Sequence, residues 1–119
     1  MKLKITAIRD AGNLDKERVV MKVESTTDIG QYVLLCVDST NGKPTTSVRN
    51  TFWFPDKSLN PGDFVVVYTK RGRPSEKEFK DAVSHFYYWG IDKPIWASQN
   101  LGAIILFAPD WESFIPSPA

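Results

Sequence analysis

Apolar and polar residues alternate along much of the chain, which is the pattern of β-strands with one buried face. Residues 2–8 alternate lysine or threonine with Leu3, Ile5 and Ala7. Residues 17–24 alternate in the same way, with valines and a methionine opposite charged side chains. Both segments are therefore predicted to be half-buried strands.

Further strands are predicted wherever apolar runs are bounded by turn residues. Residues 31–37 are almost continuously apolar, which predicts a central strand with both faces covered. The other predicted strands are 49–54, 64–69, 84–89 and 102–107. Asn41-Gly42 predicts a chain reversal, and Pro61-Gly62 fits a type II turn, whose third residue needs a positive φ. These seven or eight short strands, with turns about every 8–12 residues, predict an all-β sandwich or small barrel.

Residues 69–81 interrupt the β pattern because they are charged and polar. Ser75 and Glu78 fit a capping box, and the apolar residues that follow have helical spacing. One interpretation is a single short helix near residues 75–83, and the other is an ordered polar loop.

Length and charge limit the possible roles. The 119 residues, 42% of them hydrophobic, predict one domain over residues 1–114, followed by a flexible proline-rich tail at 115–119. The 15 basic and 14 acidic residues leave a net charge of +1. This balance argues against a surface that is basic everywhere, but it permits a local basic patch.

No apolar run reaches the roughly 7–15 residues of a signal peptide or the ~20 of a membrane span. A cytoplasmic protein without a membrane span is therefore the default expectation. The single cysteine, Cys36, excludes an intramolecular disulfide, and its leucine and valine neighbours predict a small buried hydrophobe.

Candidate catalytic groups are few. His85 is the only histidine, and in a strand it would share a face with Tyr87 and Trp89. Two interpretations remain: a buried, aromatic-like side chain, or a pocket for a small enzyme or carbohydrate binder. The acidic residues are scattered at turns, and no phosphate-binding, nucleotide-binding, nucleophile or calcium motif is present. We therefore expect no enzyme activity, no catalytic residue, no metal and no cofactor.

Two surface features are candidate binding elements. The densest basic stretch contains Lys70, Arg71 and Arg73 and continues through Lys80; it predicts either a solvated loop or contacts with phosphate. The alternation also places Trp53 opposite its two phenylalanine neighbours. If it is exposed, Trp53 offers a stacking surface; otherwise it packs in the core.

The stretch Phe52-Trp53-Phe54-Pro55 … Leu59-Asn60-Pro61-Gly62-Asp63, followed by the valine-rich strand, resembles the middle of the lamin-tail domain family. Residues 5–8, 19–23 and 32–35 are similar to its opening strands, and residues 96–106 to its tryptophan segment and late strand. The chain departs from the family at Ala97-Ser98 and in the long charged connection of residues 70–85. The resemblance implies a stand-alone bacterial or phage-type member with an immunoglobulin-like sandwich and a binding role, without catalytic residues.

The leading hypothesis is a non-enzymatic, structural or binding module whose partner is a protein, either a second copy or another chain. One alternative is a nucleic-acid-associated module acting through the Lys70–Lys80 segment. The other is a small enzyme or carbohydrate binder with an aromatic site around His85, Tyr87 and Trp89.

Overall fold

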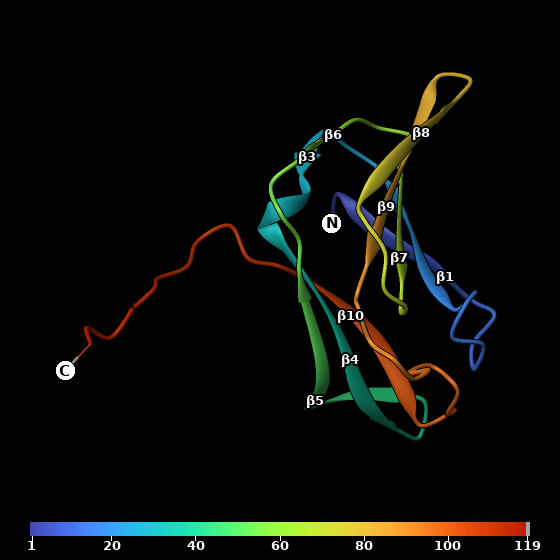
Figure 1. The fold of residues 1–119 in the computed structure, drawn as a ribbon, viewed down its shortest axis with the longest axis vertical. Coiled ribbons are helices and arrows are strands. Elements are labelled where there is room, and N and C mark those ends of the chain that lie inside the picture. The colour runs from blue at the N-terminus through green and yellow to red at the C-terminus, as the bar shows by residue number, and fades with distance from the viewer. Residues whose placement is uncertain (119) are drawn as a thin grey trace.

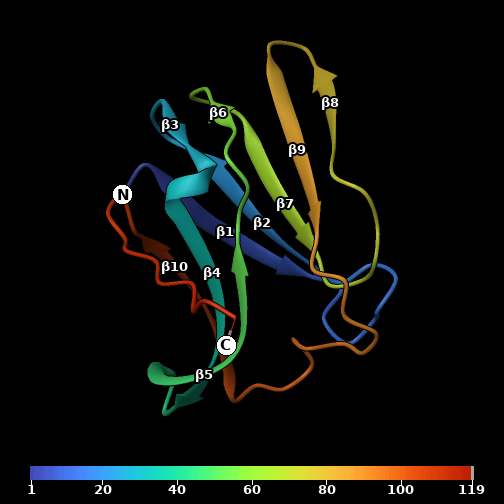
Figure 2. The same ribbon diagram turned by 60° about the vertical axis from the view of Figure 1, so that its left-hand side comes forward.

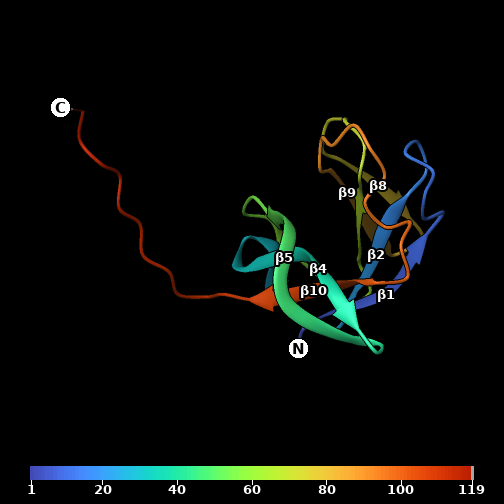
Figure 3. The same ribbon diagram turned by 90° about the horizontal axis from the view of Figure 1, so that it is seen from below.

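Two β-sheets packed face to face form the body of the protein, as Figures 1 and 3 show. This computed structural model describes residues 1–118. The strands in these residues are β1 (Leu3–Arg9), β2 (Arg18–Val23), β3 (Thr27–Asp28), β4 (Tyr32–Thr40), β5 (Lys43–Trp53), β6 (Ser58–Leu59), β7 (Phe64–Tyr68), β8 (Ser75–Phe79), β9 (Ala82–Tyr88) and β10 (Leu101–Phe107); one 3-10 turn, η1, covers Ile29–Gln31. The prediction of an all-β sandwich is confirmed.

The larger sheet has the strand order β1-β2-β7-β9-β8, and the smaller sheet has the order β10-β4-β5. The short strands β3 and β6 pair separately at one end of the sandwich. Every pairing is antiparallel except β7 with β9, which run in the same direction. A parallel pair needs a long connection, and here that connection contains β8.

The core lies between the two sheets and consists of the inward-facing residues of the alternating strands. Met21 and Val65 of the larger sheet are fully buried, as are Leu34 and Cys36 of the smaller sheet. Burial of such side chains contributes about 1.5–3 kcal/mol each, so this layer holds the sheets together. Cys36 is thus a buried hydrophobe, as expected, and burial raises the pKa of its thiol.

The prediction for residues 75–83 is wrong, because this segment is neither a helix nor a loop. β8 and β9 form a hairpin in which Ser75 pairs with Phe86 and Phe79 pairs with Ala82. Lys80 makes the reversal with φ = 57°. Pairing with β9, which is itself anchored to β7, outweighs the local helical spacing.

The two glycine turns that the sequence indicates are present. Asp63 N–H donates to Asn60 O at 3.1 Å across a turn in which Gly62 has φ = 90°. At the tip between β4 and β5, Asn41 and Gly42 both have positive φ. Both central residues of a type I′ hairpin turn need this conformation, which asparagine and glycine adopt most easily.

A buried carboxylate links the two sheets at the end opposite β3 and β6. Glu17 is fully buried and accepts a hydrogen bond from the Thr69 hydroxyl at 2.5 Å, next to the end of β7. It also accepts from the backbone N–H groups of Gly12, Ile95 and Trp96 at 2.9–3.2 Å. Residues 95–96 belong to the connection that leads into β10. These four donors satisfy the carboxylate without a cation.

The chain leaves the sandwich after β10 as an irregular arm of residues 108–118, which projects away from the body in Figures 1 and 3. The predicted tail, 115–119, lies within this arm, apart from residue 119, which is outside the described residues. The other chain end lies close to the start of the arm (Figure 2), and Met1 and Phe107 line one hollow of about 420 Å³.

Candidate functional site

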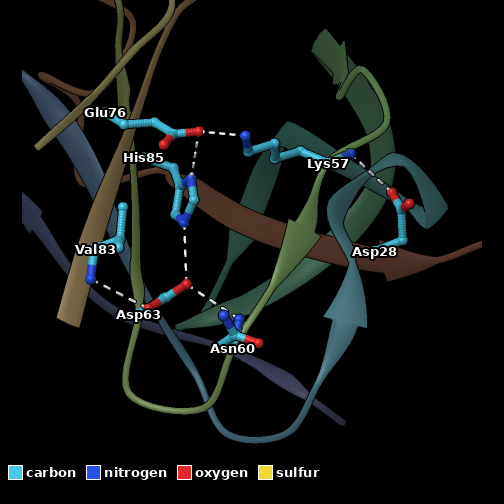
Figure 4. Close-up of polar contacts among 7 residues, drawn as sticks. All are labelled: Asp28, Lys57, Asn60, Asp63, Glu76, Val83 and His85. Atoms are coloured by element: carbon cyan, nitrogen blue, oxygen red, sulfur yellow. Dashed lines mark hydrogen bonds and ion pairs between the residues drawn. The ribbon is translucent and has the colours of Figure 1, made fainter. Parts of the chain in front are cut away.

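His85 lies at the centre of a polar cluster on the inward-facing side of β8 and β9, with Glu76 and Lys57 exposed at its rim (Figure 4). It is 4% exposed, and its Nε2 is 3.1 Å from Asp63 Oδ2. Its Nδ1 is 3.7 Å from Glu76 Oε1, which in turn contacts Lys57 Nζ at 2.5 Å. Asp63 comes from the turn before β7, Glu76 from β8 and His85 from β9, so the cluster joins three segments of the larger sheet.

The hydrogen bonds of Asp63 fix its charge and the orientation of the histidine. Burial raises the pKa of Asp63, but hydrogen bonds from Asn60 N–H, His85 and Val83 N–H outweigh burial and leave this pKa below its usual range. An ionised carboxylate only accepts hydrogen bonds, so His85 Nε2 carries a proton and donates a hydrogen bond to Asp63. Lys57 likewise lowers the pKa of Glu76.

The remaining histidine nitrogen does not face a nucleophile. Among the described residues, His85 Nδ1 has no hydrogen-bond partner, and 3.7 Å to Glu76 is too long for one. To activate a serine, threonine or cysteine of the protein, this atom would need that hydroxyl or thiol within about 3.2 Å. Instead, the nearby carboxylate is held by Lys57. The arrangement suits a structural tie between β8, β9 and the turn before β7.

A shallow hollow of about 210 Å³ lies over this cluster and is lined by residues that include Lys57, Glu76, His85 and Tyr87. Tyr87 is largely buried, contacts the rings of Phe52 and Phe54, and has its pKa raised by burial. Trp89 is not part of the hollow. Its ring lies between those of Phe52 and Trp96. The three predicted aromatic-site residues are therefore neighbours that do not line one pocket together.

The basic residues Lys70, Arg71 and Arg73 lie in the connection between β7 and β8. Arg71 and Arg73 are exposed, while Lys70 is half-buried with its Nζ 5.2 Å from the centre of the Tyr68 ring. Gly72 packs so closely on Tyr88 that a Cβ there would lie 2.4 Å from a ring carbon. The connection thus lies against the outer side of the larger sheet.

Trp53 is half exposed, at 50%, while its neighbours Phe52 and Phe54 point into the sandwich. Its indole N–H donates to the Gly30 carbonyl at 2.9 Å, which fixes the ring at the end of β5. The ring of Trp111, from the arm, meets it edge to face at a centroid distance of 5.0 Å. Trp53 therefore belongs to a surface, not to the core.

That surface is the outer side of the smaller sheet, which we call the apolar face. Residues paired directly across strands share a face, and the pairs define two rows. The rows are Leu106–Val33–Trp53 and Ile104–Leu35–Thr51. They contain no charged residue. Leu106 is 44% exposed, and Val33, Leu35 and Ile104 are half-buried.

Sequence reasoning missed Glu17, Asp63, Glu76 and Lys57. Their roles depend on partners far along the chain, and only the Asn60-Pro61-Gly62-Asp63 turn gave a local signal. In residues 1–118, no group of three or more histidine, cysteine or acidic residues is placed to hold a metal ion. Over the same residues, no helix has the length and apolar character needed to cross a membrane.

Comparison with known proteins gives no assignment. No family model matches the chain. No curated protein matches it at a significant level. The resemblance to lamin-tail domains thus stays a prediction that rests on the Leu59-to-Asp63 turn and its flanking strands.

Proposed function

We propose that the protein is a non-enzymatic module that joins another protein chain through its apolar face, and that this chain is a second copy. The observation that carries the proposal is the uncovered outer side of the smaller sheet. Its two rows are apolar except for Thr51, and Leu106 and Trp53 are about half exposed there, with only the ring of Trp111 from the arm against Trp53. Contiguous apolar surface of this kind is typical of interaction sites.

The composition of β4 supports a covered state. Its residues Tyr32 to Val37 are almost all apolar on both faces, as in strands that are buried on both sides. Within one molecule the inward-facing Leu34 and Cys36 are fully buried, whereas the outward-facing Val33 and Leu35 of this strand are only half-buried. The edge strands β5 and β10 flank it and leave their outer edges unpaired in the described part of the chain, which also favours association.

The arm favours a second copy as the occupant. It carries Trp111, Phe114 and Ile115 in exposed positions, with Phe114 86% exposed. Residues 109–118, fully extended, would reach about 33 Å, close to the roughly 30 Å length of β4. The arm thus matches the apolar face in length and in apolar character.

The buried histidine supports the non-enzymatic half of the proposal. Both nitrogens of His85 face carboxylates, and the one without a hydrogen bond meets Glu76. Activation of a protein nucleophile by Nδ1 would require a hydroxyl or thiol in the position that Glu76 occupies.

Sedimentation velocity over a range of concentrations tests the proposal on the full chain. We expect concentration-dependent association that Leu106→Glu abolishes, because a carboxylate would be buried without a partner. Phe79→Glu is the matched control, since Phe79 is 71% exposed at the end of β8, away from the smaller sheet. It should associate like the wild type.

Two results would overturn the proposal. The first is a wild type that stays monomeric up to about 1 mM, where association is worth less than about 4 kcal/mol. The second is a Leu106→Glu variant that associates as strongly as Phe79→Glu. If the arm folds back on the apolar face of its own chain, the wild type will stay monomeric, which is the first of these results.

A further inference from the structure

The outer side of the larger sheet gathers basic residues that are far apart in the sequence. Lys4 pairs with Lys22, Lys22 with Phe64, Phe64 with Ser84, and Ser84 with Lys77. Because directly paired residues share a face, this row crosses all five strands with a cation near each edge. A second row contains Arg9, Arg18, Tyr68 and Tyr88. We call this surface the basic face.

Aromatic rings occupy the middle of the basic face. Phe64 and Tyr68 lie on β7, and Phe86 and Tyr88 on β9; all four are half-buried, so part of each ring is exposed. Tyr68 and Tyr88 stack with centroids 5.4 Å apart and an interplanar angle of 12°. Arg18 lies 5.9 Å from the centre of the Tyr68 ring.

Acidic residues are almost excluded from the basic face. Glu76 and Glu78 on β8 pair with inward-facing positions of β9, so their side chains point to the other side. The exceptions are Asp10 at the rim, which binds Arg18 at 2.7 Å, and Glu24, which follows β2 and continues the outward alternation of Lys22. Among the described residues, Lys4, Arg9, Lys22 and Lys77 make no ion pair. Although the net charge of the chain is only +1, the basic face therefore carries a local excess of positive charge.

The connection between β7 and β8 adds to this surface. Gly72 contacts the ring of Tyr88, which holds the connection against the outer side of the sheet. Arg71 and Arg73 flank this glycine and are exposed. The stretch that the sequence singled out as basic thus lies at one end of the basic face and extends it.

We propose that the basic face binds single-stranded nucleic acid. Lysines and arginines at the strand edges and in the connection contact phosphates, while the partly exposed rings of Phe64 and Phe86 stack against bases. Tyr68 and Tyr88 are stacked on each other and extend this aromatic platform. Single strands are bound in this way, by cations that follow the backbone and by aromatic rings that accept any base. A broad sheet does not enter the major groove, which admits a helix or a two-stranded ribbon, so a duplex is disfavoured. This surface is opposite the apolar face and is independent of the association proposed above.

Fluorescence anisotropy with a labelled 15-nucleotide oligothymidylate tests the proposal on the full chain. With about five phosphate contacts, log K should fall with log salt with a slope of about −3.5. Lys4→Glu/Lys22→Glu should weaken binding at least tenfold at low salt. The control, Lys43→Glu/Lys93→Glu, changes the charge equally at two exposed lysines outside the larger sheet. It should weaken binding by no more than about twofold.

A second variant separates base stacking from charge alone. Phe86→Leu keeps an apolar side chain of similar size and should weaken oligothymidylate binding about fivefold without changing the salt slope. Binding of heparin should not change.

Three outcomes would overturn the proposal: no oligothymidylate binding at low salt, equal effects of the two charge-reversal pairs, or no effect of Phe86→Leu. If vesicles of phosphatidylcholine and phosphatidylserine bind more tightly than oligothymidylate, the face is a membrane surface and the proposal is wrong. Circular dichroism of each variant shows whether it is folded.

Discussion

The outer faces of the two sheets differ more than any other two regions of the molecule. The apolar face, with Leu35 and Leu106, carries no charge in its central rows. The basic face carries cations at both edges and aromatic rings between them, as with Lys22 and Tyr68. Yet their inner sides are alike, because both are built from valine, leucine and aromatic residues that fill one core. The inward-facing residues of both sheets must be apolar to form the core. The outward-facing residues are free of this constraint, so the two sheets can present different surfaces there.

This difference also separates what each face can bind. An apolar surface gains free energy by excluding water, which favours a protein surface and is weakly dependent on salt. A basic surface gains it by releasing counterions, which favours a polyanion and depends steeply on salt. One small sandwich can therefore hold two kinds of partner on opposite sides without competition between them.

The largest effect on stability is expected from removal of Glu17, the buried carboxylate that ties β7 to the connection before β10. Glu17→Ala leaves four donors in a buried site without their acceptor. It should lower the free energy of unfolding by at least about 3 kcal/mol and weaken both self-association and oligothymidylate binding. Urea denaturation measures the loss. Glu24→Ala, at an exposed position, should change stability by less than about 0.5 kcal/mol. Similar stabilities for the two variants would show that Glu17 does not join the sheets.

The next largest effect tests whether the faces are independent. Leu106→Glu should abolish association and leave oligothymidylate binding within about twofold of wild type. The reason is that the two sheets lie about 10 Å apart and the apolar and basic faces are on their outer sides, farther apart still. Lys4→Glu/Lys22→Glu should do the reverse. Sedimentation and anisotropy on the same preparations measure both. A variant that impairs both activities while still folded would contradict the separation of the faces.

Acid should weaken the tie between β9 and the turn before β7. Asp63 ties β9 to the turn before β7, and its pKa in the folded protein is below the unfolded value of about 3.9. Its stabilising contribution is therefore complete above that value and is lost as the pH falls through the folded pKa. Asp63→Asn should be less stable at pH 7, and its stability should change less below about pH 4 than that of the wild type.

Thermal denaturation from pH 2 to pH 7 measures this, with the exposed Asp92→Asn as a control that keeps the wild-type profile. Equal acid sensitivity of the wild type and Asp63→Asn would exclude Asp63 as a source of the pH dependence.

The smallest effect on stability is expected from a probe of the apolar face. Thr51 is exposed on β5, opposite Leu35, whereas Cys36 is fully buried and its thiol has a raised pKa. Cys36→Ala/Thr51→Cys should react rapidly with a thiol reagent when dilute and slowly when concentrated, because association covers this face. The wild type should react slowly at every concentration. Reaction at the same rate in both conditions would show that Thr51 stays uncovered.

The alternation of apolar residues was enough to predict the sandwich, because burial of one strand face is a local property of the sequence. Residues 2–8 and 17–24 became β1 and β2, with Leu3, Met21 and the alternate valines inside as expected. The prediction that Ala7 shares the face of Leu3 and Ile5 is wrong, because a bulge after Ile5 changes the register and pairs Ala7 with the outward-facing Val20. The Asn60-to-Asp63 turn was equally predictable, since glycine suits its positive φ. The hairpin of β8 and β9 was not predictable, because its structure is decided by pairing and not by the spacing within residues 75–83.

The candidate surfaces depend on distances along the chain that local patterns do not contain. Glu17 accepts hydrogen bonds from residues 52, 78 and 79 positions away. Lys4, Lys22 and Lys77 look like isolated surface charges until strand pairing sets them in one row. The alternation placed Trp53 opposite its neighbours, but which side of β5 is covered depends on the packing of the whole sheet.

The N-terminus and the start of the arm lie at one corner of the sandwich, which limits where a tag can be attached. Met1 and Phe107 line the same hollow, and the arm starts one residue later, beside the row that ends in Leu106. An affinity tag or fluorescent fusion at the N-terminus would stand next to the start of the arm and interfere with association through the apolar face. The β4–β5 tip at Asn41 and Gly42 is exposed at the opposite end of these strands, so an insertion there offers a label that leaves the corner clear.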